Sequence, residues 1–134
     1  MHSHTIEIRV RYGETDQMGY VYYGNYAQYF EMGRVEWLRN LGITYKRMEE
    51  LGIMLPVLKL NTDYLKPAKY DDLLTLKTTL IKRPSVRIEF NFELFNEQNE
   101  LLTKAYCSLV FIDMKKNKPT KAPDYIIDKV NEFF

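Results

Sequence analysis

The chain has 134 residues, of which 46% are hydrophobic and 14% aromatic, so its length and composition predict one domain over residues 1–134 with a substantial core. Its 19 Lys and Arg against 18 Asp and Glu give a formal net charge of +1, without the basic excess that a nucleic-acid-binding domain needs. One cysteine excludes an internal disulfide. No stretch approaches the ~20 apolar residues that span a bilayer, and the N-terminus lacks a signal-peptide pattern. The sequence therefore predicts a cytoplasmic protein without membrane insertion.

The first predicted elements are a strand over residues 6–12, where apolar and charged side chains alternate, and a helix over residues 26–42. Asn25 is the expected N-cap of this helix, with Gln28 reaching back to it. Gly33 in mid-helix costs about 1 kcal/mol relative to Ala, so we expect close packing against a sheet to compensate. The apolar face of the helix consists of Tyr26, Phe30, Gly33, Trp37 and Leu41.

The second half of the chain is dominated by strand patterns, which follow a short helix over residues 44–51. Short connections between strands favour antiparallel neighbours. The predicted fold class is therefore α+β, with a five-stranded antiparallel sheet against one long helix. The other strands are predicted over residues 53–65, 72–82, 86–94 and 101–113, and a terminal helix over residues 124–134 follows a sheet-breaking segment, residues 115–123.

Two features of this arrangement predict a homo-oligomer, a homodimer or a homotetramer. One sheet covers only one side of such an apolar helix, and long edge strands invite pairing with another chain. The alternative is a monomer whose sheet edges are protected by Lys and Pro.

The segment GETDQMGYVYYGNY, residues 13–26, carries one Asp, Asp16, and leads into the long helix. The amides around Tyr23 have no intrahelical partners and lie at the positive end of the helix dipole, where a carbonyl oxygen gaining negative charge is stabilised. A carboxylate facing a carbonyl polarised in this way can attack it or activate a water. Asp16 could equally cap a turn, because Glu-Thr-Asp (residues 14–16) before Gly is a common turn sequence. The residues alone leave both readings open.

The segment RYGETDQMGYVYYGNYAQYFEMGRVEWL resembles the start of hotdog-fold acyl-CoA thioesterases of the 4-hydroxybenzoyl-CoA thioesterase group, which includes the Tol–Pal-associated bacterial enzymes. The resemblance implies a hotdog fold, with the sheet wrapped around one central helix, and makes Asp16 the catalytic carboxylate. It makes the backbone N–H of Tyr23 the donor that polarises the thioester carbonyl. Many bacterial members have His at this position, so the Tyr23 side chain is a departure that leaves the backbone role intact.

The implied function is hydrolysis of a short-chain or aromatic acyl-CoA to free acid and CoA. Two alternatives stay open: an acyl-thioester-binding protein without turnover, and a thioesterase acting on acyl carrier protein. A hotdog-fold dehydratase needs an active-site His, and His2 and His4 lie at a terminus that we expect to be frayed.

Arg83 and Arg87 are the candidate contacts for the phosphates of CoA, because they flank Pro84-Ser85 at a strand start. Glu31 is a second acidic candidate, although an ion pair with Arg34 three residues on is the more ordinary expectation. Cys107 is expected to be a small buried side chain. No metal or cofactor is predicted, because no metal-ligand spacing or glycine-rich nucleotide motif is present.

Overall fold

The computed structural model describes residues 2–134, which form one large sheet, one long helix and several short elements. The strands of the large sheet are β1 (His2–Arg9), β3 (Val57–Tyr64), β4 (Leu73–Leu80), β5 (Arg87–Phe95) and β6 (Leu101–Val110). The helices are α1 (Tyr26–Asn40), α2 (Tyr45–Glu50) and α3 (Asp124–Val130), with single 3-10 turns η1 (Tyr12–Glu14), η2 (Tyr23–Asn25) and η3 (Asn131–Phe133).

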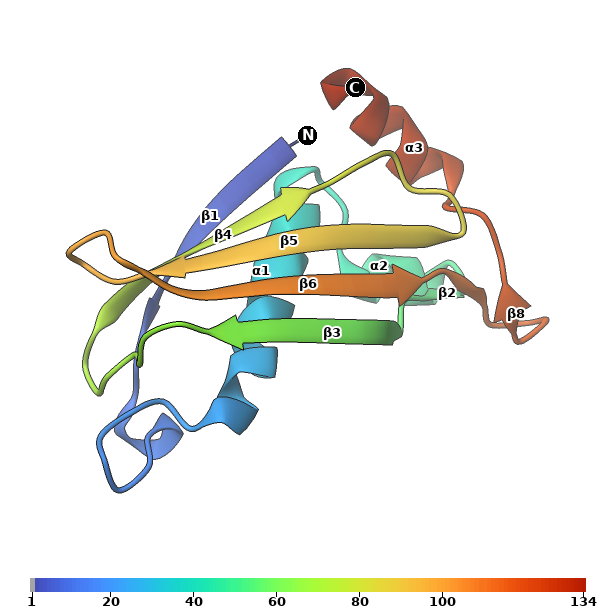
Figure 1. Ribbon diagram of the computed structural model, residues 1–134. Coiled ribbons are helices and arrows are strands. Elements are labelled where there is room, and N and C mark those ends of the chain that lie inside the picture. The colour runs from blue at the N-terminus through green and yellow to red at the C-terminus, as the bar shows by residue number, and fades with distance from the viewer. Residues whose placement is uncertain (1) are drawn as a thin grey trace.

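The large sheet has the order β1-β4-β5-β6-β3, and every pair of neighbours is antiparallel. Figure 1 shows α1 behind this sheet, running across its strands, with β1 and β3 at the two edges. Side chains of β4 and β5 alternate between buried and partly exposed, as a strand with one covered face requires. The predicted α+β class with a five-stranded antiparallel sheet and one long helix is confirmed.

The apolar face of α1 is the centre of the core. Tyr26, Phe30 and Trp37 are almost completely buried, as the helical spacing predicts. A Cβ atom on Gly33 would lie 2.5 Å from Thr78 Oγ1 and 2.8 Å from a Leu76 methyl carbon. The predicted close packing of Gly33 is therefore present, and it is made against β4.

Asn25 occupies the predicted N-cap position of α1, but the predicted side-chain capping bond is absent. Asn25 has helical backbone angles and its side chain makes no capping bond; its Nδ2 group instead donates to the carbonyl of Glu14 at 2.8 Å. The chain reaches α1 through η2, so the residues before the helix already turn helically.

A second, three-stranded sheet was not predicted. Its strands are β2 (Ile53–Met54), β7 (Ile112–Asp113) and β8 (Lys118–Pro119), in the order β2-β7-β8. The predicted strand over residues 53–65 is thus divided into β2 and β3, and the segment 115–123, predicted to break the sheet, contains β8. Two-residue strands have no periodicity that a sequence pattern could reveal.

The first strand differs from its prediction at both ends. It begins at His2 and ends at Arg9, and Tyr12 lies in η1. The N-terminus is therefore not frayed from residue 2 onward: the ring of His2 stacks on Phe133 at 3.8 Å between centroids, and Trp37 Nε1 donates to the His2 carbonyl at 3.1 Å. No helix in residues 2–134 is long and apolar enough to cross a membrane.

Candidate active site

The candidate site lies on a hairpin between β1 and α1, at the lower left in Figure 1. Asp16 N–H donates to the Tyr20 carbonyl at 2.8 Å, and Tyr22 N–H donates to the Glu14 carbonyl at 2.9 Å. The turn between these arms contains Gly19, whose φ of 75° is one that glycine adopts without steric cost. The hairpin thus places Asp16 near its tip and leads the chain to the start of α1.

The two carboxylate oxygens of Asp16 have different surroundings. Oδ1 accepts hydrogen bonds from Met18 N–H at 2.9 Å and Tyr20 N–H at 3.2 Å, so it caps the turn. Oδ2 accepts no hydrogen bond from residues 2–134, and the side chain is exposed. Burial raises the pKa of Tyr26 in the first turn of α1, and the Asp16 charge adds to this rise. Asp16 thus holds one carboxylate oxygen in the turn and leaves the other without a partner in the described residues.

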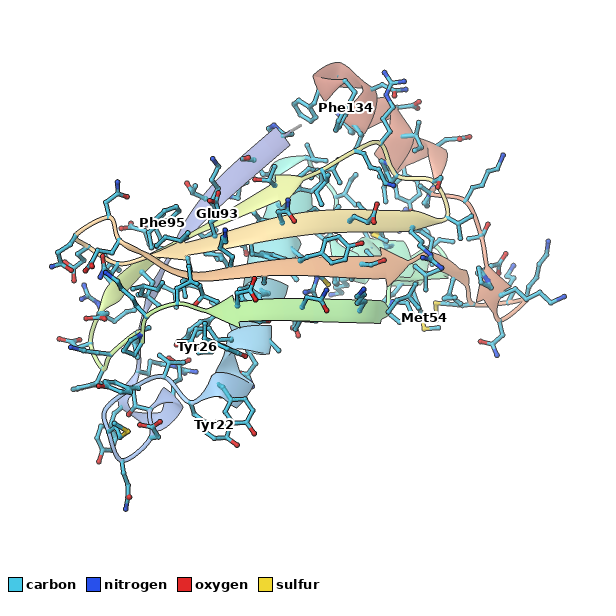
Figure 2. All side chains as sticks on the ribbon, viewed as in Figure 1. Tyr22, Tyr26, Met54, Glu93, Phe95 and Phe134 are labelled. Atoms are coloured by element: carbon cyan, nitrogen blue, oxygen red, sulfur yellow. The ribbon has the colours of Figure 1, made fainter. Side chains whose placement is uncertain are left out.

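The amides at the start of α1 are available to a ligand. Tyr23 is the first residue of η2, which continues directly into α1. Within residues 2–134, neither Tyr23 N–H nor Gly24 N–H donates to an acceptor in the protein. Both lie at the positive end of the helix. Figure 2 shows Tyr22 and Tyr26 at this end of α1, below the edge strand β3.

Glu14 connects the hairpin to the helix. The residue is only 8% exposed, and Oε1 accepts hydrogen bonds from Arg11 N–H at 2.8 Å and from the Tyr29 hydroxyl at 2.9 Å. Oε2 accepts from the Arg11 guanidinium at 3.2 Å. Burial alone would raise the pKa of Glu14, but these hydrogen bonds outweigh it and hold the pKa below its ordinary value. Glu14 is therefore ionised at neutral pH.

The predicted ion pair between Glu31 and Arg34 is absent from the described residues. Glu31 is exposed, whereas Arg34 is buried and donates to Tyr45 Oη at 3.4 Å and to Cys107 Sγ at 3.9 Å. Burial raises the pKa of the Cys107 thiol although Arg34 opposes the shift, in keeping with the buried, neutral side chain that the sequence predicts. The three-residue spacing predicts contact between Glu31 and Arg34, but the buried Arg34 side chain points toward Cys107 on β6 instead.

Arg83 and Arg87 do not lie beside Asp16 in the same chain. Both are at the end of the sheet where β4 finishes and β5 begins, whereas the hairpin is at the end where β4 starts. Arg83 donates from Nη2 to the carbonyl of Phe134 at 2.9 Å, and Arg87 is exposed. One protomer therefore keeps the two parts of the predicted site apart.

The residue that sequence reasoning missed is Glu14. The prediction treated it as part of a turn, because its buried hydrogen bond is with Tyr29, fifteen residues further on. Its only local signal is the three-residue spacing from Arg11, with which it forms an ion pair. A hollow of about 400 Å³ lies beside it, lined by Arg11, Gly13, Asn25 and Gln28.

A larger hollow of about 770 Å³ lies on the sheet face that points away from α1. Polar side chains such as Asn61, Lys77, Asn91 and Lys104 line it. Among residues 2–134, no group of three or more His, Cys, Asp and Glu side chains is placed to hold a metal ion.

Comparisons with known proteins agree with this architecture. Residues 10–130 match the model of the thioesterase-like superfamily. The chain is 36% identical over 119 residues to the putative acyl-CoA thioesterase YneP of Bacillus subtilis, covering 89% of this chain and 86% of that protein. It is 30% identical over 120 residues to the acyl-CoA thioester hydrolase YbgC of Escherichia coli, covering 90% of each.

Among solved structures, the DHNA-CoA thioesterase of Staphylococcus aureus superposes with a TM-score of 0.86 at 36% sequence identity. The match covers all of this chain and 85% of the other. This likeness confirms the hotdog fold that the resemblance predicts, with the sheet wrapped around α1.

Proposed function

Because the chain belongs to the thioesterase-like superfamily, we propose that it hydrolyses acyl-CoA thioesters carrying short-chain or aromatic acyl groups. An aromatic acyl group is supported by the likeness to a DHNA-CoA thioesterase and by the tyrosines that surround the hairpin. Tyr22 and Tyr23 are exposed, and Tyr26 packs edge-on against Tyr64 at 5.1 Å between ring centroids. Rings of this kind offer apolar surface together with hydroxyl groups.

The single observation that carries the mechanism is that the two oxygens of the Asp16 carboxylate have different hydrogen-bond partners. Oδ1 is held by two amides, which fixes the side chain, while Oδ2 is unbonded and exposed. The amides of Tyr23 and Gly24 are free donors at the start of α1. A thioester whose carbonyl oxygen accepts from Tyr23 N–H would have its developing negative charge stabilised there.

Two reactions fit this geometry. In the first, Oδ2 attacks the thioester carbon and CoA leaves as its thiolate; water then hydrolyses the acyl anhydride and regenerates Asp16. In the second, Oδ2 takes a proton from a water that attacks the same carbon, and the proton passes to the departing CoA sulfur. Both give a free acid and CoA.

The substitution Asp16→Asn tests this assignment. Asn keeps the size of the side chain and the turn-capping oxygen, so the fold should be retained, but it removes the negative charge. We expect kcat to fall by about 10²–10⁴-fold while the melting temperature changes little. Thiol release from a panel of short, long and aromatic acyl-CoAs, with one acyl carrier protein thioester beside them, gives the rates and the substrate class.

Asp113 provides the matched control, because its Oδ1 caps a turn in the same way, accepting from Lys115 N–H at 2.9 Å and Lys116 N–H at 3.2 Å. Asp113→Asn should leave kcat unchanged. If Asp16→Asn and Asp113→Asn both change kcat only slightly and by the same amount, Asp16 is a turn cap and not a catalytic residue. Binding of acyl-CoA without any thiol release by the unmodified protein would favour the binding-protein alternative.

We also propose that the working unit is a homodimer in which β3 pairs with β3 of a second copy. β3 is an edge strand with exposed Val57, Leu58, Leu60 and Tyr64. Antiparallel pairing about a two-fold axis would set the Tyr64 end of one β3 beside the Val57 end of the other. In each chain Tyr64 lies near Tyr26 and hence near the hairpin.

The opposite end of the sheet carries the two arginines. Arg87 pairs with Val110, one residue beyond Leu109, which is paired with Val57. The proposed dimer therefore brings Arg83 and Arg87 of one chain to the same end as Asp16 of the other. In this arrangement they can bind the phosphates of a CoA whose thioester lies at the partner's hairpin.

Mixing two inactive partners tests this shared site. An equal mixture of Asp16→Asn and Arg83→Ala/Arg87→Ala chains, unfolded and refolded together, forms heterodimers with one fully intact site if the residues come from different chains. We expect kcat/KM of the mixture to exceed the mean of the two parent variants several-fold. If each site is built from one chain, no heterodimer has an intact site, and the mixture will equal that mean.

A further inference from the structure

Glu14 joins four separate parts of the candidate site through hydrogen bonds. Its carboxylate accepts from the Arg11 amide and guanidinium, two residues after the end of β1, and from the Tyr29 hydroxyl on α1. Its main-chain carbonyl accepts from Tyr22 N–H at 2.9 Å and Asn25 Nδ2 at 2.8 Å. One residue thus ties the hairpin to the turn that leads into the helix and to the helix itself.

The bonds from Arg11 and Tyr29 to the carboxylate favour the ionised form of Glu14. Burial alone would raise its pKa, yet the hydrogen bonds from Arg11 and Tyr29 hold the pKa below the ordinary value. Burial and the adjacent Glu14 carboxylate raise the pKa of Tyr29, so the tyrosine keeps its proton and donates it. A charged carboxylate that accepts from three N–H groups and one hydroxyl forms a stiffer link than a neutral side chain.

Glu14 lies close in the chain to both residues of the proposed reaction, Asp16 and Tyr23. Asp16 follows two residues later on the same arm of the hairpin, and Tyr23 directly follows Tyr22, whose amide Glu14 holds. If the carboxylate link is broken, the main-chain bonds of the hairpin remain, but the hairpin arm that carries Asp16 loses its side-chain bond to Tyr29 on α1. The Asp16 carboxylate can then shift relative to the start of the helix. Misplacement by about 1 Å costs roughly 10²-fold in rate.

We propose that Glu14 is a positioning residue for the reaction: through the bonds of its carboxylate to Arg11 and Tyr29, it holds the Asp16 arm of the hairpin in a fixed relation to the start of α1. The proposal rests on the proposed function of Asp16 and adds a residue that touches neither substrate nor reacting atoms.

Two substitutions test this proposal, and they remove different parts of the Glu14–Tyr29 link. Glu14→Gln removes the charge, and Tyr29→Phe removes one hydroxyl while keeping the ring in the core. We expect kcat to fall by about 10–10²-fold in each folded variant, with KM within about twofold, because alignment is lost and the binding surface is kept. Should Glu14→Gln fail to fold, Tyr29→Phe decides alone; a normal kcat in a folded variant overturns the proposal.

The chain offers a matched control in Glu89 on β5. Its carboxylate accepts a hydrogen bond from the Tyr106 hydroxyl and forms an ion pair with Lys82, and its pKa is lowered chiefly by the Tyr106 bond. Glu89→Gln and Tyr106→Phe therefore break the same kind of link on the sheet. They should leave kcat unchanged. A loss of kcat equal to that of Glu14→Gln would show a general structural effect and overturn the positioning role.

A double variant separates this inference from the proposed function. If Glu14 acts by placing Asp16, Glu14→Gln should lower kcat in the parent protein but hardly at all in the Asp16→Asn background. Additive losses would mean that Glu14 does not act through Asp16, which overturns the proposal. A normal kcat of Asp16→Asn alone would instead contradict the proposed function, so the two failures give different results.

Discussion

The two edges of the large sheet, β1 and β3, have the same length but opposite degrees of cover. Burial along β1 alternates, its inward side chains pack beneath α1, and it exposes no large hydrophobic side chain. Along β3 nearly every residue is exposed, including Leu58 at 52% and Leu60 at 37%. In Figure 1, α1 crosses behind the sheet and β3 forms its lower edge.

The difference indicates which edge is complete within one chain. β1 is also paired on one side only, but its apolar face is covered and it carries polar side chains outward, so its free edge offers a partner no apolar side chains. β3 offers both unpaired backbone groups and apolar side chains, the two features that soluble proteins avoid on a free edge. We call β1 the closed edge and β3 the open edge. The open edge lies next to the candidate site, because Tyr64 at its end contacts Tyr26.

The largest expected effect comes from placing a charge on each edge in turn. Leu60→Lys puts an ammonium group on β3 and, in the proposed dimer, brings two like charges together near the two-fold axis. We expect the mass measured by light scattering at micromolar concentration to fall from dimer to monomer. Turnover should fall on the order of 10²-fold, because the site loses the second chain.

The matched change on the closed edge is Thr5→Lys, at an exposed position of β1. It should leave both mass and turnover unchanged. A monomer mass for the unmodified protein in a sample that hydrolyses acyl-CoA would contradict the proposed role of the open edge.

A smaller effect is expected where α1 meets the closed side of the sheet. Gly33→Ala adds a Cβ atom 2.5 Å from Thr78 Oγ1 and 2.8 Å from Leu76, which forces the buried contact apart at a cost of about 1–3 kcal/mol. The gain in helix propensity of about 1 kcal/mol offsets part of this cost. Urea unfolding should show a net loss of stability of about 1 kcal/mol.

Thr78 allows this explanation to be checked. Its hydroxyl is buried and has no hydrogen-bond partner in the described residues, so Thr78→Ala removes the atom that Gly33→Ala would strike. The double variant Gly33→Ala/Thr78→Ala should be more stable than the sum of the single changes predicts. Strict additivity would mean that the close approach at Gly33 does not limit stability.

The same contrast explains what the sequence could reveal. The helical stripe of α1 and the alternation of β5 are regular over many residues, so periodicity predicts them. The small sheet of two-residue strands has no such signal, and the hydrogen bond of Glu14 to Tyr29 joins residues fifteen apart. Spacing likewise placed Glu31 beside Arg34 but could not tell that Arg34 would turn inward to Cys107.

In the site, the chemistry of the residues was more informative than their geometry. Asp16 is the one Asp before the start of the helix, which made it a candidate whatever its exact surroundings. The sequence left turn capping and catalysis as alternatives, whereas the structure assigns the capping to Oδ1 and leaves Oδ2 unbonded. The separation of Arg83 and Arg87 from Asp16 follows from strand direction, which becomes visible only once the sheet order is known.

The smallest expected effect is a pH dependence of stability on the closed edge, at His2. Burial, with smaller contributions from His4 and the N-terminal charge, lowers the pKa of His2 below its ordinary value of 6.5. The folded protein therefore binds a proton at His2 less readily than the unfolded chain does. Stability contributed by neutral His2 is present above pH 6.5 and is lost as the pH falls below that value.

The expected result is a fall of a few degrees in melting temperature on acidification below pH 6.5, at constant ionic strength. His2→Phe keeps an aromatic ring against Phe133, stacked at 3.8 Å in the parent, but cannot titrate, so this part of the pH dependence should disappear. His4→Gln on the same strand removes only the smaller contribution of His4 and leaves the burial of His2 in place, so it should retain most of the dependence. If His2→Phe shows the same acid sensitivity as the parent protein, protonation at another group governs it, because the stacked imidazole would then contribute nothing to the folded state's proton balance.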